Sequence, residues 1–217
     1  MRNMIRLLAL AISTIGPCGP ALAQASPAAA RDSAFSWGLK GGVNFANALL
    51  APDLPTGFSK SARTGFLGGA FAEARLSDVF SVQFEAFYTQ KGFEVSSAAG
   101  KATYRLDYLE FPLTAKATFG SGPLRPYLFA GPNVGYRLSA DVDTGSSSAD
   151  FRDATRTTDI GVDLGAGVSY RLSRGTGLLL EGRYSVGLVN IFSTGPAGGT
   201  VNTRDLKILA GVTFAFH

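Results

Sequence analysis

The sequence has 217 residues, of which 46% are hydrophobic and only 17% charged, with a formal net charge of +4. A soluble domain usually has a charged fraction of roughly 25%, so this composition argues against an ordinary soluble protein. The apolar residues are nevertheless spread out, and no internal stretch suits a transmembrane helix of about 20 residues. The 27 glycines and 11% aromatic residues instead favour many twisted strands in close contact.

The N-terminus has the parts of a secretory signal peptide. Arg2 and Arg6 precede a short apolar run over residues 7–16, and small residues follow it up to a predicted cleavage between Ala23 and Gln24. The apolar run is too short to span a membrane as an anchor. We therefore expect the chain to be exported.

Cleavage would divide the sequence into three parts. These are a signal peptide (1–23), a disordered lead-in rich in Ala, Ser and Pro (24–34) and a folded β-barrel domain (35–217). Because cleavage removes Arg2 and Arg6, the mature net charge falls to +2, which gives no reason to expect a nucleic-acid partner. Cys18 is the only cysteine and leaves with the signal, so the mature chain has no disulfide and no thiolate chemistry.

From Trp37 onward, apolar and polar residues alternate with the period of two that is typical of strands. The segment near Ile160 is the most regular, with Ile160, Val162 and Leu164 separated by glycine and aspartate. Eight such segments occur: 37–46, 64–75, 79–91, 103–119, 125–140, 157–171, 177–189 and 203–216. Most have ten or more residues, as a tilted membrane strand of about 9–11 residues requires.

The connections alternate in length along the chain. Residues 47–63, 92–102, 141–156 and 190–202 form long polar links, and residues 76–78, 120–124 and 172–176 form short ones. This rhythm is typical of an up-and-down barrel with short periplasmic turns and long outer loops. The sequence therefore predicts an all-β fold, an eight-stranded antiparallel up-and-down transmembrane β-barrel.

Alternation alone does not separate this fold from a soluble, lipocalin-like barrel whose apolar face points inward. The polar face, however, also carries the bulky residues Phe71, Phe87, Tyr127 and Phe129, which suit a filled lumen better than a water-washed exterior. Aromatic residues on the apolar face lie toward strand ends, where membrane interfaces fall. We therefore expect the apolar face to contact lipid.

The polar face carries charges of both signs in similar number, which fits a narrow interior filled by paired side chains. Lys91 is one candidate. The others form the expected lumen charge network: Lys40, Glu73, Glu85, Glu110, Lys116, Arg137, Asp163, Arg171, Glu181, Arg183 and Lys207. We expect this network to set the strand register and close the lumen rather than bind a ligand.

Several stretches resemble the PorT-like outer-membrane β-barrel family, also described as a porin family. They are WGLKGGVN (37–44), FSVQFE (80–85), YTQKG (88–92), LDYLEFPL (106–113), PYLFAGP (126–132), GAGV (165–168) and EGRY (181–184). The resemblance covers residues 35–216 and implies a barrel in the cell outer membrane, in contact with its lipid and inserted by the barrel-assembly machinery. Many such chains end on Phe, whereas His217 follows Phe216 here.

The sequence offers little for catalysis. Small membrane-barrel enzymes as families use a His with Ser or acidic partners, and the only His is His217 at the C-terminus, on the periplasmic side. Without Cys or further His, a transition-metal site is not expected, and the acidic stretch 141–153 does not match a calcium loop. We expect no enzyme activity, no cofactor and no metal.

Three functional hypotheses stay open. The first is an envelope scaffold or a surface-recognition protein that acts through its long outer loops. The second is a narrow porin-like channel for small solutes, which requires charges of one sign along a path. The third is an accessory subunit of a secretion or motility machine, with an envelope protein as its partner.

Overall fold

A computed structural model describes residues 34–51, 57–98, 100–145, 148–150, 156–173, 175–189 and 200–215. The expected signal peptide, the cleavage between Ala23 and Gln24, the lead-in up to residue 33, and Phe216 and His217 lie outside these residues. The strands are β1 (Phe35–Ala51), β2 (Ser59–Arg75), β3 (Phe80–Ser97), β4 (Gly100–Thr118), β5 (Leu124–Asp143), β6 (Ser148–Asp150), β7 (Thr158–Arg171), β8 (Thr176–Gly187) and β9 (Thr200–Ala215). No helix in the described part of the chain is long and apolar enough to cross a membrane.

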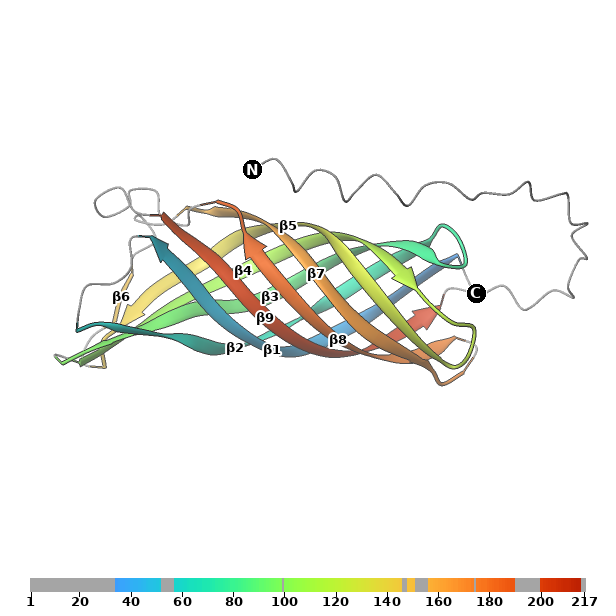
Figure 1. Ribbon diagram of the computed structural model, residues 1–217, viewed down its shortest axis with the longest axis horizontal. Coiled ribbons are helices and arrows are strands. Elements are labelled where there is room, and N and C mark those ends of the chain that lie inside the picture. Colours follow the sequence, from blue (N-terminus) through green and yellow to red (C-terminus); the bar gives the residue numbers. More distant parts are fainter. Residues whose placement is uncertain are drawn as a thin grey trace, which may run out of the picture. The chain divides into compact units, whose positions relative to one another are not determined.

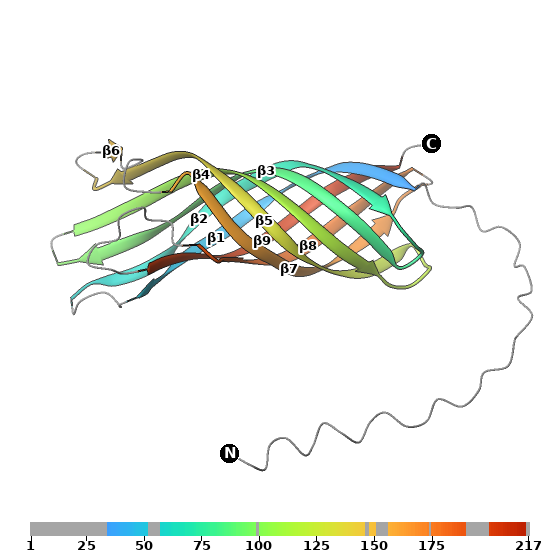
Figure 2. The same ribbon diagram turned by 90° about the horizontal axis from the view of Figure 1, so that it is seen from above.

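Eight long strands close into a ring (Figures 1 and 2). The sheet order is β4-β3-β2-β1-β9-β8-β7-β5, and β4 also pairs with β5 to close it. All of these pairs are antiparallel, while the three-residue β6 adds to one end of β5. Closure gives every long strand two hydrogen-bonded neighbours, so no open edge is left among them. The predicted eight-stranded antiparallel barrel is confirmed.

The connections at one end are short, as expected. They lie between β2 and β3, β4 and β5, and β7 and β8. In the first turn the Leu76 N–H donates to the Phe80 carbonyl at 2.9 Å, and the Phe80 N–H donates to the Ser77 hydroxyl at 3.0 Å. The Leu172 N–H donates to the Thr176 carbonyl in the same way, at 3.0 Å. We call this the short-turn end of the barrel and the opposite end the long-loop end.

The strands extend further at the long-loop end than the sequence predicted. A long loop was expected over residues 92–102, but β3 and β4 continue into a tight hairpin in which Ser97 pairs with Gly100. There Phe93 stacks on Tyr104 at 4.7 Å between ring centroids, and Phe93 packs in one buried cluster with Leu106 and Ala140. This cluster stabilises the paired strands, so the prediction of a loop was wrong.

The two faces of the sheet differ sharply. Outward side chains are apolar and exposed, such as Phe66 (69%), Leu128 (56%) and Leu39 (51%), whereas inward ones are buried and mostly polar. Aromatic residues line both rims of the outer face, for example Trp37, which contacts Phe214 at 4.9 Å between centroids, and Tyr136 at the other rim. A soluble barrel has its apolar side chains inside and its polar ones outside. Here the exterior is apolar and the interior is charged, which suits contact with lipid.

A closed barrel of this kind should resist unfolding by detergent at room temperature, because every strand is paired on both sides. We expect the unboiled protein to migrate faster on a denaturing gel than the boiled protein. Identical mobility of the two samples would contradict a stable closed ring.

Candidate functional site

The centre of the barrel holds a cluster of five charged side chains, which we call the central layer. Lys40 of β1 contacts Glu85 of β3 at 2.7 Å and Glu181 of β8 at 2.8 Å, measured between nitrogen and oxygen. Arg183 contacts Asp163 of β7 at 3.1 Å and Glu181 at 2.7 Å, and it also pairs with Glu85. The ion pairs therefore connect four strands across the lumen.

Aromatic and amide groups fill the space around the central layer. The guanidinium of Arg183 lies over the rings of Phe129 and Phe87, at 4.9 and 5.5 Å, and Lys40 lies over Phe71 at 4.8 Å. The amide of Gln83 donates to Glu85 at 2.7 Å. The charged side chains of the layer are at most 1% exposed, so water has almost no access to them.

A second cluster, the outer layer, lies nearer the long-loop end. Lys91 contacts Glu110 at 2.8 Å, Asp205 at 3.2 Å and Asp159 at 3.4 Å, while Lys207 contacts Glu110 at 2.6 Å. The two layers are connected because the Asn133 amide donates to Glu110 at 3.4 Å and to Asp163 at 3.3 Å. The lumen is thus blocked twice by buried side chains of both signs.

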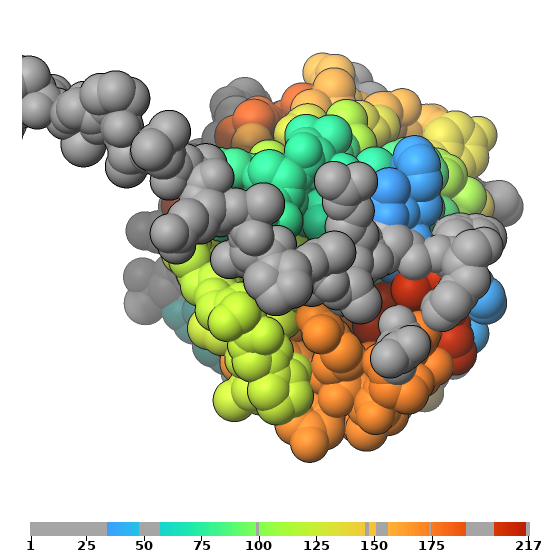
Figure 3. Space-filling model, turned by 90° about the vertical axis from the view of Figure 1, so that its right-hand side faces the viewer, coloured from blue at the N-terminus to red at the C-terminus, as the bar shows by residue number. Residues whose placement is uncertain are grey.

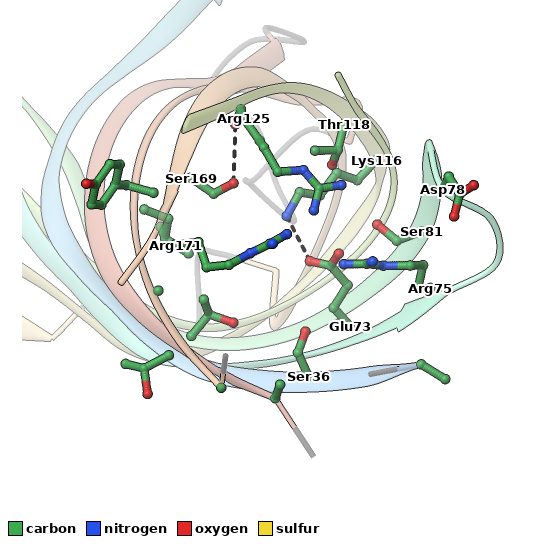
Figure 4. A pocket seen from close by; sticks show the side chains of 18 of the residues that line it. Ser36, Glu73, Arg75, Asp78, Ser81, Lys116, Thr118, Arg125, Ser169 and Arg171 are labelled. Atoms are coloured by element: carbon green, nitrogen blue, oxygen red, sulfur yellow. Dashed lines mark hydrogen bonds and ion pairs between the residues drawn. The ribbon is translucent and has the colours of Figure 1, made fainter. Parts of the chain in front are cut away.

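The short-turn end is more open. A cavity of about 130 Å³ lies inside this mouth, and residues of all three short turns contribute to its lining. Figure 3 looks onto this end of the barrel, with the short turns at its rim. At its base Lys116 contacts Glu73 at 2.8 Å and lies over the Tyr127 ring at 4.2 Å. Figure 4 shows the side chains of Arg75, Arg125 and Arg171 on the cavity wall.

The structure brings most of the expected network residues together, but in three places. Lys40, Glu85, Asp163, Glu181 and Arg183 form the central layer, Glu110 and Lys207 belong to the outer layer, and Glu73 and Lys116 lie at the mouth. Arg137 is buried and lies opposite Tyr108 across the β4–β5 pair. Arg171 lies apart from both layers, exposed at the end of β7 on the wall of the mouth cavity.

Two members of the outer layer, Asp159 and Asp205, were absent from the predicted network. Both lie on the inward face at an even spacing from a predicted member, Asp159 four residues before Asp163 and Asp205 two residues before Lys207. The alternation rule could therefore have identified both as lumen residues.

The arrangement suits structural charge pairing better than catalysis. The carboxylates of the central layer contact cations directly, and an ion-paired carboxylate is a poor general base. Within the described ranges, no group of three or more His, Cys, Asp or Glu residues is arranged to hold a metal ion. The only histidine, His217, lies outside the described residues.

Comparisons with known proteins agree with this architecture. OprG from Pseudomonas aeruginosa aligns with a TM-score of 0.57 at 15% identity, over 85% of this chain and 97% of that one. Neisserial surface protein A (NspA) aligns with a TM-score of 0.53 at 22% identity, over 85% and 98%. These identities show a shared fold only. A search of curated proteins found no match to the sequence.

The family described as outer membrane protein beta-barrel domain matches residues 22–193, which is most of the chain. The match agrees with the closed ring, the apolar exterior and the solved outer-membrane proteins that share the fold. The protein is therefore located in the outer membrane. In outer-membrane barrels the short turns face the periplasm, so we call the short-turn end the periplasmic end. The chain belongs to the outer membrane protein beta-barrel domain family.

Proposed function

We propose that the protein is a closed, non-enzymatic barrel that acts as an envelope scaffold or a surface-recognition protein through its outer end. The observation that carries this proposal is the central layer, in which Arg183 and Lys40 contact three carboxylates across the lumen. A conducting pore needs a continuous water-filled path, and rings of charges of one sign along it select the ions that pass. Interdigitated charges of both signs favour a plug instead.

The outer end suits recognition. There β3 and β4 form a long hairpin, and β5 continues to Asp143 and pairs with β6. Exposed ion pairs join Lys101 to Glu94 at 2.7 Å and Arg105 to Asp143 at 3.1 Å. A polar surface held on paired strands can present a fixed shape to a binding partner.

The resemblance to PorT-like barrels motivates the alternative of an accessory subunit of a secretion or motility machine. That function needs a stable envelope partner, whereas a scaffold or recognition protein is folded and complete alone. We further expect the barrel-assembly machinery to insert the chain during biogenesis, since a closed barrel cannot enter the membrane strand by strand without exposing unpaired backbone groups.

The test is electrical conductance in planar lipid bilayers. We expect the purified protein to give no steady conductance, because the central layer is at most 1% exposed. As a control that the assay can detect opening, serine replaces Lys40, Glu85, Glu181 and Arg183 of the central layer together with Lys91, Glu110 and Lys207 of the outer layer, because both layers block the lumen. This variant should conduct after its gel mobility has shown that it folds.

Steady channels from the wild-type protein, of the same size as those of the serine variant, would overturn the closed-barrel proposal. That outcome would favour the narrow porin-like channel. A partner that copurifies in fixed proportion with a closed wild-type barrel would instead support the accessory-subunit alternative.

A further inference from the structure

The periplasmic mouth contains a cavity that the side chains of the central and outer layers do not fill. Its volume is about 130 Å³, and its wall is built from the inner ends of several strands and from the short turns. An apolar cavity of roughly 150 Å³ holds a molecule as large as benzene, so this space can admit a small ligand. The cavity opens toward the periplasm and is closed behind by the central layer.

The charged residues on this wall are mainly cationic. Among the described residues that line the cavity, Arg75, Lys116, Arg125 and Arg171 are opposed by two carboxylates, Glu73 and Asp78. The formal charge of the wall is therefore +2. In Figure 4 the four cationic side chains extend from four different strands toward the middle of the mouth.

The central and outer layers, which lie deeper in the lumen, each have a net negative charge. Counting the described residues, the central layer has two cations and three carboxylates, and so does the outer layer. An anion from the periplasm is attracted to the mouth and repelled by the layers behind it. Of these three groups of described residues, the mouth is therefore the one with a net positive charge.

The remaining wall suits an oxyanion. Hydroxyl groups of Ser36, Ser81 and Ser169 line the cavity, and Phe71 and Leu179 form apolar surface in its wall. The Ser169 hydroxyl donates to the Arg125 carbonyl at 3.2 Å, which ties β7 to β5 beside two of the arginines. Arginine binds carboxylate and phosphate through two parallel hydrogen bonds, and hydroxyls supply further donors.

We propose that the periplasmic mouth is a binding site for a small oxyanion that carries phosphate or carboxylate groups. The charge of the wall selects the sign of the ligand, the cavity volume limits it to one small group or a compact di- or tricarboxylate, and the plug prevents its passage. The ligand chemistry is shared by free periplasmic anions and by phospholipid headgroups of the inner leaflet. The site is independent of the proposed role of the outer end.

The test uses the mature chain, refolded in an uncharged detergent so that no lipid phosphate is present. Isothermal titration measures binding of inorganic phosphate and of citrate at low ionic strength. We expect saturable binding of both anions, tighter for citrate because it has more carboxylates. Arg171→Gln should weaken citrate binding about tenfold, since it removes one charge-assisted pair, and Arg125→Gln with Arg171→Gln should abolish measurable binding.

The matched control is Arg105→Gln, which removes another exposed arginine at the opposite end of the barrel, where it pairs with Asp143 at 3.1 Å. Citrate affinity should be unchanged in this variant. Arg171 is exposed, so Arg171→Gln should also keep the wild-type gel mobility. The proposal fails if the wild-type protein binds neither anion, or if Arg171→Gln and Arg105→Gln have equal effects.

Nanodiscs distinguish the two sources of ligand. Citrate affinity is measured for the wild-type protein and for Arg171→Gln, each in phosphatidylcholine discs and in phosphatidylglycerol discs. If a headgroup is the ligand, phosphatidylglycerol should compete with citrate, and the loss of citrate affinity should be larger for the wild-type protein than for Arg171→Gln. An equal change in both proteins reports only the surface potential of the lipid and supports a free periplasmic anion.

Discussion

Arg183→Met should lower the free energy of unfolding by about 3–5 kcal/mol, the usual cost of breaking a buried ion pair by removing one partner. Arg183 contacts Glu85, Asp163 and Glu181, and its side chain is 1% exposed. Methionine keeps much of the volume but leaves three carboxylates facing one remaining cation of the layer, Lys40. Repulsion among these carboxylates should loosen the strands that carry them.

The measurement is urea unfolding in lipid vesicles, followed by the fluorescence of Trp37. Trp37 is the only tryptophan of the chain and faces outward at one rim, so its emission reports insertion into lipid. Arg105→Met is the control, because Arg105 pairs with Asp143 at a side-chain exposure of 52%, and exposed pairs contribute about 0–1 kcal/mol. Equal unfolding midpoints for Arg183→Met and the wild type would show that the central layer does not stabilise the barrel.

A rescue separates charge from packing. Adding Glu85→Gln and Asp163→Asn to Arg183→Met removes two of the negative charges that have lost their arginine partner, while keeping side-chain size. We expect the triple variant to recover part of the lost stability, since a neutral polar layer lacks the repulsion. A triple variant that is less stable than Arg183→Met would assign the loss to packing around Phe129 and Phe87 instead.

Gly42→Ala should lower the free energy of unfolding by about 3 kcal/mol or more, at the upper end of the usual cost of overpacking. Gly42 lies between Leu67 of β2 and Leu209 of β9 in the sheet. A methyl group on its Cα would collide with the carbonyl oxygen of Ile208. The obstacle is backbone, so no side-chain rotation relieves it, and β1 and β9 would have to separate.

Its neighbour provides a matched control. Gly41 lies on the outward face of the same strand, where the nearest atom to an added methyl group is the Leu67 carbonyl oxygen at 3.7 Å. Gly41→Ala should therefore be neutral or slightly stabilising, because alanine reduces the freedom of the unfolded chain. The measurements are the folding yield and the urea midpoint of the two variants. A similar decrease of the midpoint in both would contradict the close approach of β1 and β9.

The alternation of apolar and polar residues was enough to predict the eight strands, the ring and the inward face. It succeeded because lipid outside and a narrow lumen inside place opposite demands on successive side chains. The strand ends at the long-loop end could not be predicted in the same way. The extension of β3 and β4 depends on the cluster of Phe93, Leu106 and Ala140, which joins residues far apart in the sequence.

The sequence by itself determined which residues face the lumen, including Lys40, Glu85 and Arg183, because that choice depends only on position along each strand. Only the tertiary structure decided their partners. Pairing depends on strand register and on height within the barrel, so Lys40 contacts Glu181, 141 residues away, while Arg171 lies exposed at the mouth. Each strand crosses the barrel at a tilt, so neighbouring strands are shifted in register relative to one another. This shift decides which inward residues share a height, and it therefore produces two blocking layers and one cationic mouth.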